Sequence, residues 1–539
     1  MLSTMQDAPL SIAQLLRHGS TFHGTAEVVT WTDAGARRRS YAEVGRRCAQ
    51  LAHALRGLGV TGDERVATFM WNNAEHLEAY LAVPSMGAVL HTLNIRLFPE
   101  QLVHVANHAE DHVVIVDATL VPLLAPQLPQ LTTVKHLIVT GDTDGIDVPD
   151  GIQVHSYDAL IADQPEEFDW PEVDELSAAA MCYTSGTTGD PKGVAYSHRS
   201  IYMHSMQVCM TDGPALKQGD RALAVVPQFH AMSWGLPYAA FMIGASLIMP
   251  DRFLQPEPLA ALIEAERPNF SAAVPTIWQG LHQYLEQHPQ DISFMHDVLI
   301  GGSAVPPSLM HTFDKDHGVQ VLHAWGMTET SPLGSVARPP ADSEGEERWR
   351  YRYTQGRFPA SVRARLVDDD GQVVPNDGES IGELEVRGPW IAASYYGVDA
   401  PDKFQDGWLR TGDVGSITPD GYLTLTDRTK DIIKSGGEWI SSVDLENAVM
   451  GHPDVIEAAV IGVPDQKWDE RPLVAVVLRE GSDATVDTLR EFLSDKVAKW
   501  QLPENWTVIN EVPKTSVGKF DKKRLRSQFQ EGNLDVTRV

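Results

Sequence analysis

A segment rich in glycine and hydroxyl side chains, Cys182–Gly193, has the composition of an anion-binding loop. It reads CYTSGTTGDPKG and lies between two apolar runs, at 178–183 and 194–196. Glycines let the backbone approach a ligand and turn N–H groups towards it, while hydroxyls and the Lys192 ammonium add donors for phosphate oxygens. The segment is not a Walker A loop, because Pro191 precedes the lysine and Gly193 follows it. By itself it is compatible with a phosphate site or with an ordinary polar hairpin.

Four further segments follow this loop in a fixed order. They are AWGMTE at 324–329, WLRTGD at 408–413, DRTK at 427–430 and PKTSVGK at 513–519. Together with the loop they resemble the adenylate-forming superfamily, which includes acyl-CoA synthetases, adenylation domains and luciferases. The resemblance covers nearly the whole chain and favours the branch of medium- and long-chain fatty acyl-CoA synthetases. It implies an acid–thiol ligase (acyl-CoA synthetase, AMP-forming).

The resemblance assigns roles around ATP. Forming an acyl-adenylate requires a weakly nucleophilic carboxylate to attack the α-phosphate, so the phosphates must be neutralised and aligned. Glu329 with the Thr184 hydroxyl would hold Mg²⁺, a cation suited to oxygen ligands, and Asp413 would accept from the ribose hydroxyls. The implied nucleotide-binding residues are Thr184, Ser185, Gly186, Thr187, Thr188, Gly189, Lys192, Gly302, Ser303, Trp325, Gly326, Met327, Thr328, Asp413 and Arg428.

The resemblance also separates two half-reactions. Lys519 would place its ammonium next to the negative charge that develops in adenylation, the first half-reaction. The nearby Lys522 and Lys523 are expected to be solvated surface lysines. Lys430 matches the family's hinge, about which the C-terminal domain would rotate for the second reaction. The catalytic residues implied are Lys519, Glu329, His230 and Thr184. Those implied for the coenzyme A step are Lys434, Gly436, Gly437 and Trp439.

The acid-binding residues are expected in three segments. PQFHAMSWG at 227–235 resembles the family's histidine motif at the carboxylate entrance, with Trp234 at the position of a gate over the acyl tunnel. A buried core role is the alternative for both His230 and Trp234. No charged side chain occurs in these segments to pair with a polar substrate, which favours an alkanoate. The expected pocket residues are His230, Trp234, Val274, Pro275, Thr276, Gly301, Gly302 and Ala304.

The predicted function is ATP-dependent activation of a medium- to long-chain fatty acid and its transfer to coenzyme A, with release of AMP and pyrophosphate. Alternatives are a ligase for a short thioether or aryl acid, an enzyme that loads a carrier protein, a luciferase-like oxygenase and a nucleotide-binding relative without catalysis. Pocket discrimination of about 1–3 kcal/mol per methylene leaves chain length undetermined. The resemblance to the long-chain branch implies a possible homodimer.

The elements that must position these residues alternate between strands and helices. Apolar runs at 65–70, 112–116, 136–139, 222–226 and 270–274 predict strands of largely parallel sheets flanked by helices, with Asn72 and Asn73 suited to cap a helix. Turn-separated short strands from 372 to 425 predict a small β subdomain. Residues 1–429 would form the adenylation domain, and residues 430–539 a mobile α+β lid. In the lid, a helix capped at 441–444, strands at 455–461 and 473–478 and a helix over 486–497 are expected.

Composition sets the remaining limits. The 539-residue chain has 43% hydrophobic and 22% charged residues, as globular proteins do. Its net charge of −30 argues against nucleic acid as a partner. Its three cysteines show no metal-ligand spacing and fit a reducing cytoplasm. The uncharged stretch from 222 to 250 is interrupted by prolines and glycine, so a strand, a turn and a buried helix are expected there and no integral membrane segment.

Overall fold

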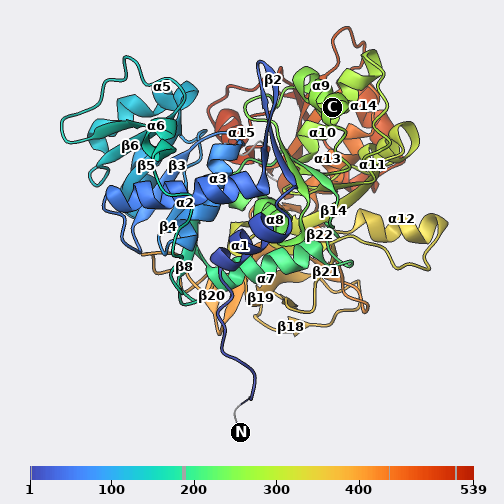
Figure 1. The fold of residues 1–539 in the computed structure, drawn as a ribbon. Helices are drawn as coiled ribbons and strands as arrows, with labels where there is room; N and C mark the ends of the chain where they lie inside the picture. Colours follow the sequence, from blue (N-terminus) through green and yellow to red (C-terminus); the bar gives the residue numbers. More distant parts are fainter. Residues whose placement is uncertain (2, 185–189, 436–437, 466, 516–518) are drawn as a thin grey trace.

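The computed structural model describes residues 1–539 except residues 2, 185–189, 436–437, 466 and 516–518 (Figure 1). Its described strands form sheets of 15, seven and six strands. The N-terminal residues extend away from the body of the molecule, and the C-terminus lies on the opposite side in Figure 1. The α/β fold class expected from the sequence is confirmed: two large strand–helix layers are followed by a smaller α+β domain.

The seven-stranded sheet has the order β7-β6-β5-β3-β4-β8-β9 and is parallel except for the β8–β9 pair. Alternate residues of its strands enter two different buried clusters: Val66 and Val113 belong to one, Ala67 and Val114 to the other. Both faces are therefore covered. Its strands are β3 (Arg65–Phe69), β4 (Val89–Thr92), β5 (Asp111–Asp117), β6 (His136–Thr140), β7 (Gln153–Ser156), β8 (Ala178–Tyr183) and β9 (Gly193–Ser197).

The 15-stranded sheet consists of two halves that meet at β14: the first is parallel except for the β1–β2 pair, and the second is antiparallel. Its first half comprises β1 (Glu27–Thr32), β2 (Gly35–Ser40), β10 (Arg221–Ala224), β11 (Ser246–Met249), β12 (Phe270–Ala273), β13 (Asp297–Ile300) and β14 (Gln320–Gly326). Its second half comprises β15 (Leu333–Val336), β16 (Gly356–Arg357), β17 (Arg363–Val367), β18 (Val373–Val374), β19 (Gly382–Arg387), β20 (Phe404–Gln405), β21 (Trp408–Ile417) and β22 (Tyr422–Arg428).

The prediction of a separate β subdomain from 372 to 425 is wrong in its extent. The antiparallel strands begin with β15 at Leu333, and β16 pairs with both β15 and β22, which makes the later strands continuous with the large sheet. The close pairing depends on Gly356, whose φ is 92° and where a Cβ would lie 1.9 Å from the carbonyl carbon of Val336. The short strand β16 is too brief to give a period-2 signal in the sequence.

The six-stranded sheet begins after the predicted hinge. It contains β23 (Ile433–Ser435), β24 (Glu438–Ile440), β25 (Val455–Asp465), β26 (Asp469–Leu478), β27 (Asn505–Val508) and β28 (Thr537–Arg538). Ser441 caps α13 by accepting from Asp444 N at 3.0 Å, as expected. Helix α14 ends at Leu493, not at 497, and a short 3-10 turn (Lys499–Gln501) follows it.

Helices cover the sheets. They are α1 (Ile12–Phe22), α2 (Tyr41–Gly57), α3 (Ala74–Ser85), α4 (Pro99–Ala109), α5 (Val121–Leu124), α6 (Tyr157–Ala162), α7 (His198–Cys209), α8 (Leu236–Ile243), α9 (Pro256–Glu266), α10 (Pro275–Gln287), α11 (Pro307–Thr312), α12 (Gly345–Tyr353), α13 (Ser442–Met450), α14 (Val486–Leu493) and α15 (Lys522–Gln530). Asn73 caps α3, as predicted, by accepting from His76 N at 3.0 Å.

The uncharged stretch from 222 to 250 folds as expected into β10, a turn, the buried helix α8 and β11. Among the described residues, no helix has the length and apolar character needed to cross a membrane. Cys48, Cys182 and Cys209 are free thiols, and the first two are buried.

Candidate active site

One cavity of about 630 Å³ gathers most of the residues singled out in the sequence. It lies where the ends of β14, β21 and β22 meet the flanks of the phosphate loop and the segment before α15. The predicted site residues in its wall are Thr184, Lys192, His230, Trp234, Gly301, Gly302, Ser303, Ala304, Trp325, Gly326, Met327, Thr328, Glu329, Asp413, Arg428, Lys430 and Lys519. Segments more than 300 residues apart in sequence therefore share one chamber.

The phosphate loop is closed at its base by two hydrogen bonds between Thr184 and Lys192. Thr184 N donates to the Lys192 carbonyl at 3.0 Å, and Lys192 N donates to Thr184 Oγ1 at 3.1 Å. The antiparallel pairing of β8 and β9 brings these two residues together. Ser185, Gly186, Thr187, Thr188 and Gly189 lie outside the described residues. The base therefore presents a hydroxyl and an ammonium to the same wall of the cavity.

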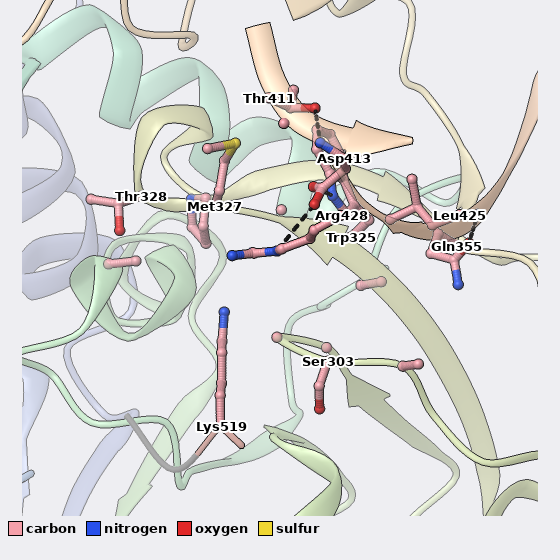
Figure 2. A pocket seen from close by; sticks show the side chains of 18 of the residues that line it. Ser303, Trp325, Met327, Thr328, Gln355, Thr411, Asp413, Leu425, Arg428 and Lys519 are labelled. Atoms are coloured by element: carbon pink, nitrogen blue, oxygen red, sulfur yellow. Dashed lines mark hydrogen bonds and ion pairs between the residues drawn. The ribbon is translucent and has the colours of Figure 1, made fainter. Parts of the chain in front are cut away.

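Asp413 is held from three sides (Figure 2). Its Oδ2 accepts from Trp325 Nε1 at 2.8 Å, its Oδ1 lies 3.3 Å from Arg428 Nε, and its backbone N donates to Thr411 Oγ1 at 3.1 Å. The β21–β22 register pairs Asp413 directly with Arg428. The Asp413 carboxylate raises the pKa of Arg428, so the guanidinium stays charged. This arrangement presents a fixed carboxylate edge suited to two neighbouring hydroxyls.

Glu329 is a buried carboxylate, 5% exposed, at the cavity wall. Tyr395 Oη donates to its Oε1 at 2.6 Å, and Lys192 Nζ lies 5.0 Å from the centre of the Tyr395 ring. One hydrogen bond to one oxygen fixes the carboxylate and leaves its other oxygen for a hard cation. In the described part of the chain no cluster of three or more His, Cys, Asp and Glu residues forms a metal site. A single carboxylate suits Mg²⁺, which in nucleotide sites keeps waters and is bound by one or two carboxylates and phosphates.

Lys519 enters the cavity from the C-terminal domain, and in Figure 2 its ammonium points towards the guanidinium of Arg428. The Lys519 Cε lies 3.3 Å from where a Cβ would stand on Gly302, a residue with φ of 85°. Burial lowers the pKa of Lys519 to about 8, with a further contribution from Arg428, while Asp413 and Glu329 oppose the shift. The ammonium is mostly charged at neutral pH and points into the cavity beside Arg428.

Trp234 stands on a left-handed turn. Met232, Ser233 and Trp234 have φ values of 56°, 51° and 55°, and Gly235 follows at 74°. Consecutive non-glycine residues in this conformation cost roughly 1–2 kcal/mol each, and such strain clusters at ligand sites. The turn places the indole Cη2 3.3 Å from the Cβ position of Gly301. Since Gly301 has no side chain, the indole can lie directly against the Gly301 backbone at the cavity wall.

Part of the cavity wall is apolar, and Trp234 packs against the buried cluster that contains Ala272, Leu299 and Leu333. The apolar lining residues, called the apolar half below, come from α7, the loop after α7, α8, β12, β13 and β15: Val208, Pro214, Leu236, Phe270, Ala272, Leu299 and Leu333. His230 lines the same cavity, and burial lowers its pKa to about 3, with smaller contributions from Lys519 and Arg96. The imidazole is therefore neutral at physiological pH and offers a hydrogen bond without a charge.

Some predicted residues lie elsewhere. Pro275 and Thr276 form the first turn of α10 and do not line the described cavity; Val274 approaches it only through Cγ1, which is 3.3 Å from the Cβ position of Gly302. Lys434 is an exposed residue of β23 whose N donates to Glu470 Oε2 at 2.9 Å, and it does not line the described cavity. Trp439 lies opposite Lys434 in β24, and its side chain lies outside the described part of the chain. Gly436 and Gly437 lie outside the described residues. The structure thus has the Lys519 segment, and not Lys434, at the cavity.

The expectation that Lys522 is a solvated lysine is wrong. Its Nζ pairs with Glu446 Oε1 at 2.7 Å and donates to Ser442 Oγ at 2.6 Å, and its side chain is 12% exposed. The Ser442 hydroxyl in turn donates to Asp427 Oδ2 at 2.6 Å. A polar chain therefore links α15 and α13 to the end of β22, directly before the predicted hinge.

Other cavity residues escaped the sequence analysis, notably Tyr395, Lys403, Gln355, Thr411 and His323. His323 Nδ1 is buried without a hydrogen-bond partner among the described residues. The one available signal was a histidine within the apolar run VLHAW at 321–325. Tyr395 and Lys403 reach the cavity through tertiary folding of the segment before β21, which local patterns do not report.

The chain matches the family model of the AMP-binding enzymes over residues 17–396 and that of their C-terminal domain over residues 444–519. It is 44% identical to a 3-methylmercaptopropionyl-CoA ligase of Ruegeria lacuscaerulensis, over 98% of this chain and 99% of the relative. It is 42% identical to a medium-chain-fatty-acid–CoA ligase of Ectopseudomonas oleovorans, with 98% of each covered. It is 43% identical to a long-chain-fatty-acid–CoA ligase of Thermus thermophilus, over 98% of this chain and 97% of the relative.

The fold is also that of a solved anthranilate CoA ligase in complex with anthranoyl-AMP, with a TM-score of 0.88 and 25% identity over 98% of this chain and 100% of that one. The chain belongs to the AMP-binding, adenylate-forming enzyme family. Within that family it is an AMP-forming acid–thiol ligase.

Proposed function

We propose that the enzyme activates a medium- to long-chain fatty acid and transfers the acyl group to coenzyme A. The observation that carries this proposal is the apolar half of the cavity wall, which shares one chamber with Glu329, Asp413 and Lys519. An alkyl chain would occupy the apolar half, with its carboxylate near His230. Two relatives that share 42–43% identity are fatty-acid–CoA ligases, which supports the same substrate class.

In the first half-reaction a carboxylate oxygen of the acid attacks the α-phosphorus of ATP, and the bond to pyrophosphate breaks. Asp413 would bind the ribose hydroxyls, and the base of the loop at Thr184 and Lys192 would hold the phosphates. The Lys519 ammonium would stabilise the charge that develops on the α-phosphate oxygens. Glu329 and the Thr184 hydroxyl would hold Mg²⁺, whose bound charge neutralises the phosphates.

In the second half-reaction the thiol sulfur of coenzyme A attacks the acyl carbon, the carbon–oxygen bond to AMP breaks and the thiol proton is released. We propose that rotation at Lys430 withdraws the Lys519 segment and brings in the segment of Lys434, Gly436, Gly437 and Trp439. The polar chain from Lys522 through Ser442 to Asp427 spans this boundary and favours the observed arrangement.

A short thioether acid is a second candidate. Two relatives, at 44% and 43% identity, are 3-methylmercaptopropionyl-CoA ligases. A thioether chain is apolar and would pack against the same wall. The two substrates differ in chain length, and therefore in how much of the chamber each fills.

The test is coenzyme A-dependent AMP release with Mg²⁺ and ATP, measured for saturated acids from acetate to palmitate and for 3-(methylthio)propionate. A maximum of kcat/KM among medium or long acids supports the proposal. A maximum at 3-(methylthio)propionate, with longer acids at least tenfold poorer, would replace it with the second candidate. If no acid gives AMP release, ATP–pyrophosphate exchange with the same acids separates a different thiol acceptor from a protein without adenylation activity.

The pH dependence of adenylation should follow Lys519. Because the pKa of Lys519 is lowered to about 8, its ammonium loses the proton as pH rises through that value. We expect kcat/KM for ATP in pyrophosphate exchange to be level near pH 7 and to fall about tenfold per pH unit above pH 8. His230 stays neutral over this range. A Lys519→Arg variant should keep a low but pH-independent rate from pH 7 to 10; a decline at the same pH as in the wild type would refute the assignment.

The acyl profile should depend on Trp234. Replacing the indole with alanine opens the contact with Gly301 and enlarges the passage to the apolar half. We expect Trp234→Ala to change the ratio of kcat/KM between octanoate and palmitate by about 10- to 100-fold, and the KM for ATP by less than about threefold. Trp500→Ala, at an exposed tryptophan outside the cavity, is the matched control. An unchanged acyl ratio would make Trp234 a core residue.

A further inference from the structure

Lys403 is a cation in the cavity wall that neither the loop nor the family segments include. The hairpin of β20 and β21 fixes its backbone: Phe404 pairs with Leu409, and Arg410 N donates to the Lys403 carbonyl at 2.9 Å. This hairpin is the same element that carries Asp413. The Lys403 Nζ lies 3.7 Å from the Cβ position of Gly412, directly before Asp413.

The carboxylates around Lys403 already have other partners. Glu329 accepts from Tyr395, Asp413 is paired with Arg428, and Glu383 is paired with Arg410. Glu329 and Asp413 attract the Lys403 ammonium most strongly, while Arg428 repels it. Within the described part of the chain, the ammonium forms neither an ion pair nor a hydrogen bond. It is half-buried, so its charge is only partly compensated by water.

We propose that Lys403 is a phosphate-binding residue of the adenylation step, whose ammonium contacts the triphosphate of ATP. The position follows from its neighbours: Asp413 marks the ribose side of the cavity and Glu329 the metal side, and the phosphates must lie between them. A half-buried ammonium without an ion-pair partner is stabilised strongly by an anion that binds as part of the substrate. Lys519 approaches the same space from the wall formed by Gly302, so the phosphates would be held by cations from both domains.

This inference rests on the proposed use of ATP and predicts a phosphate-specific loss. In Lys403→Met the side chain keeps its length and loses its charge. We expect the Kd for Mg²⁺-ATP, measured by calorimetry without any acid, to rise about 10- to 100-fold, and the Kd for adenosine to change less than about twofold. Lys403→Arg should restore ATP binding to within about fivefold of the wild type. Lys467→Met, at an exposed lysine outside the cavity, should bind both ligands as the wild type does.

The same variants separate a binding role from a structural one. Removing an uncommitted, half-buried charge should leave the melting temperature of Lys403→Met equal to or above that of the wild type. Equal weakening of ATP and adenosine, or unchanged binding of both, would overturn the inference. Since binding is measured without an acid, this result does not depend on which acid the enzyme uses. Failure of the wild type to bind ATP would refute the proposed function itself.

Discussion

The Lys519→Ala variant is expected to lose ATP–pyrophosphate exchange by about 100- to 1,000-fold and to keep the second half-reaction. The ammonium lies in the cavity beside Arg428, where burial lowers its pKa to about 8, and it would face the ribose and phosphates of bound ATP. A single charge-stabilising donor in such a place contributes roughly two to three orders of magnitude to a rate. Transfer from supplied acyl-adenylate to coenzyme A should change less than about threefold, because the rotation that we propose at Lys430 would remove the Lys519 segment from the cavity before that step.

Two controls isolate the chemical role. Lys519 makes no ion pair with any described residue, so its removal should not lower the melting temperature. Lys499→Ala changes an exposed lysine of the same domain and should leave both half-reactions intact. Equal loss of both half-reactions in Lys519→Ala, with an unaltered melting temperature, would show that Lys519 does not act in the adenylation step alone.

The fold was predictable where the strands are continuous apolar runs. The runs at 65–70, 112–116 and 136–139 are strands of the seven-stranded sheet, because both faces of a parallel sheet are buried and its strands are continuously apolar. The antiparallel half was only partly predictable. Its strands are short, and β16, with two residues, is defined by the partners it bridges.

The site residues were also only partly predictable from the sequence. Asp413, Glu329 and Lys519 lie in segments whose composition and order are informative, and the structure brings them into one cavity. Pro275 and Thr276 were misplaced because a sequence segment near a pocket does not reveal which of its residues the helix start turns towards it. Tyr395 was missed because its hydrogen bond to Glu329 joins residues 66 positions apart, which no local pattern connects. Lys403 was missed because its place in the hairpin of β20 and β21 does not show that its side chain reaches the cavity wall.

Replacement of Asp413 by asparagine should weaken both half-reactions, in contrast to the change at Lys519. The variant keeps the shape of the side chain and loses the charge that pairs with Arg428. The ribose is present in ATP and in the acyl-adenylate, so both ligands should bind less tightly. We expect kcat/KM for ATP and for acyl-adenylate to fall about 100- to 1,000-fold each. Asp420→Asn, at an exposed aspartate on the turn between β21 and β22, is the matched control.

Deoxynucleotides test whether the loss arises at the ribose. In the wild type, 2′-deoxy-ATP should be poorer than ATP by about 10- to 150-fold, the range for a hydrogen bond to a charged acceptor. In Asp413→Asn the difference should shrink to less than about threefold, because the hydroxyl and the carboxylate form one interaction that either change removes. If the variant still discriminated as strongly as the wild type, the carboxylate would act by holding Trp325 and Arg428 in place and not by binding the sugar. The double substitution of protein and ligand therefore distinguishes a contact with the ribose from support of the wall around it.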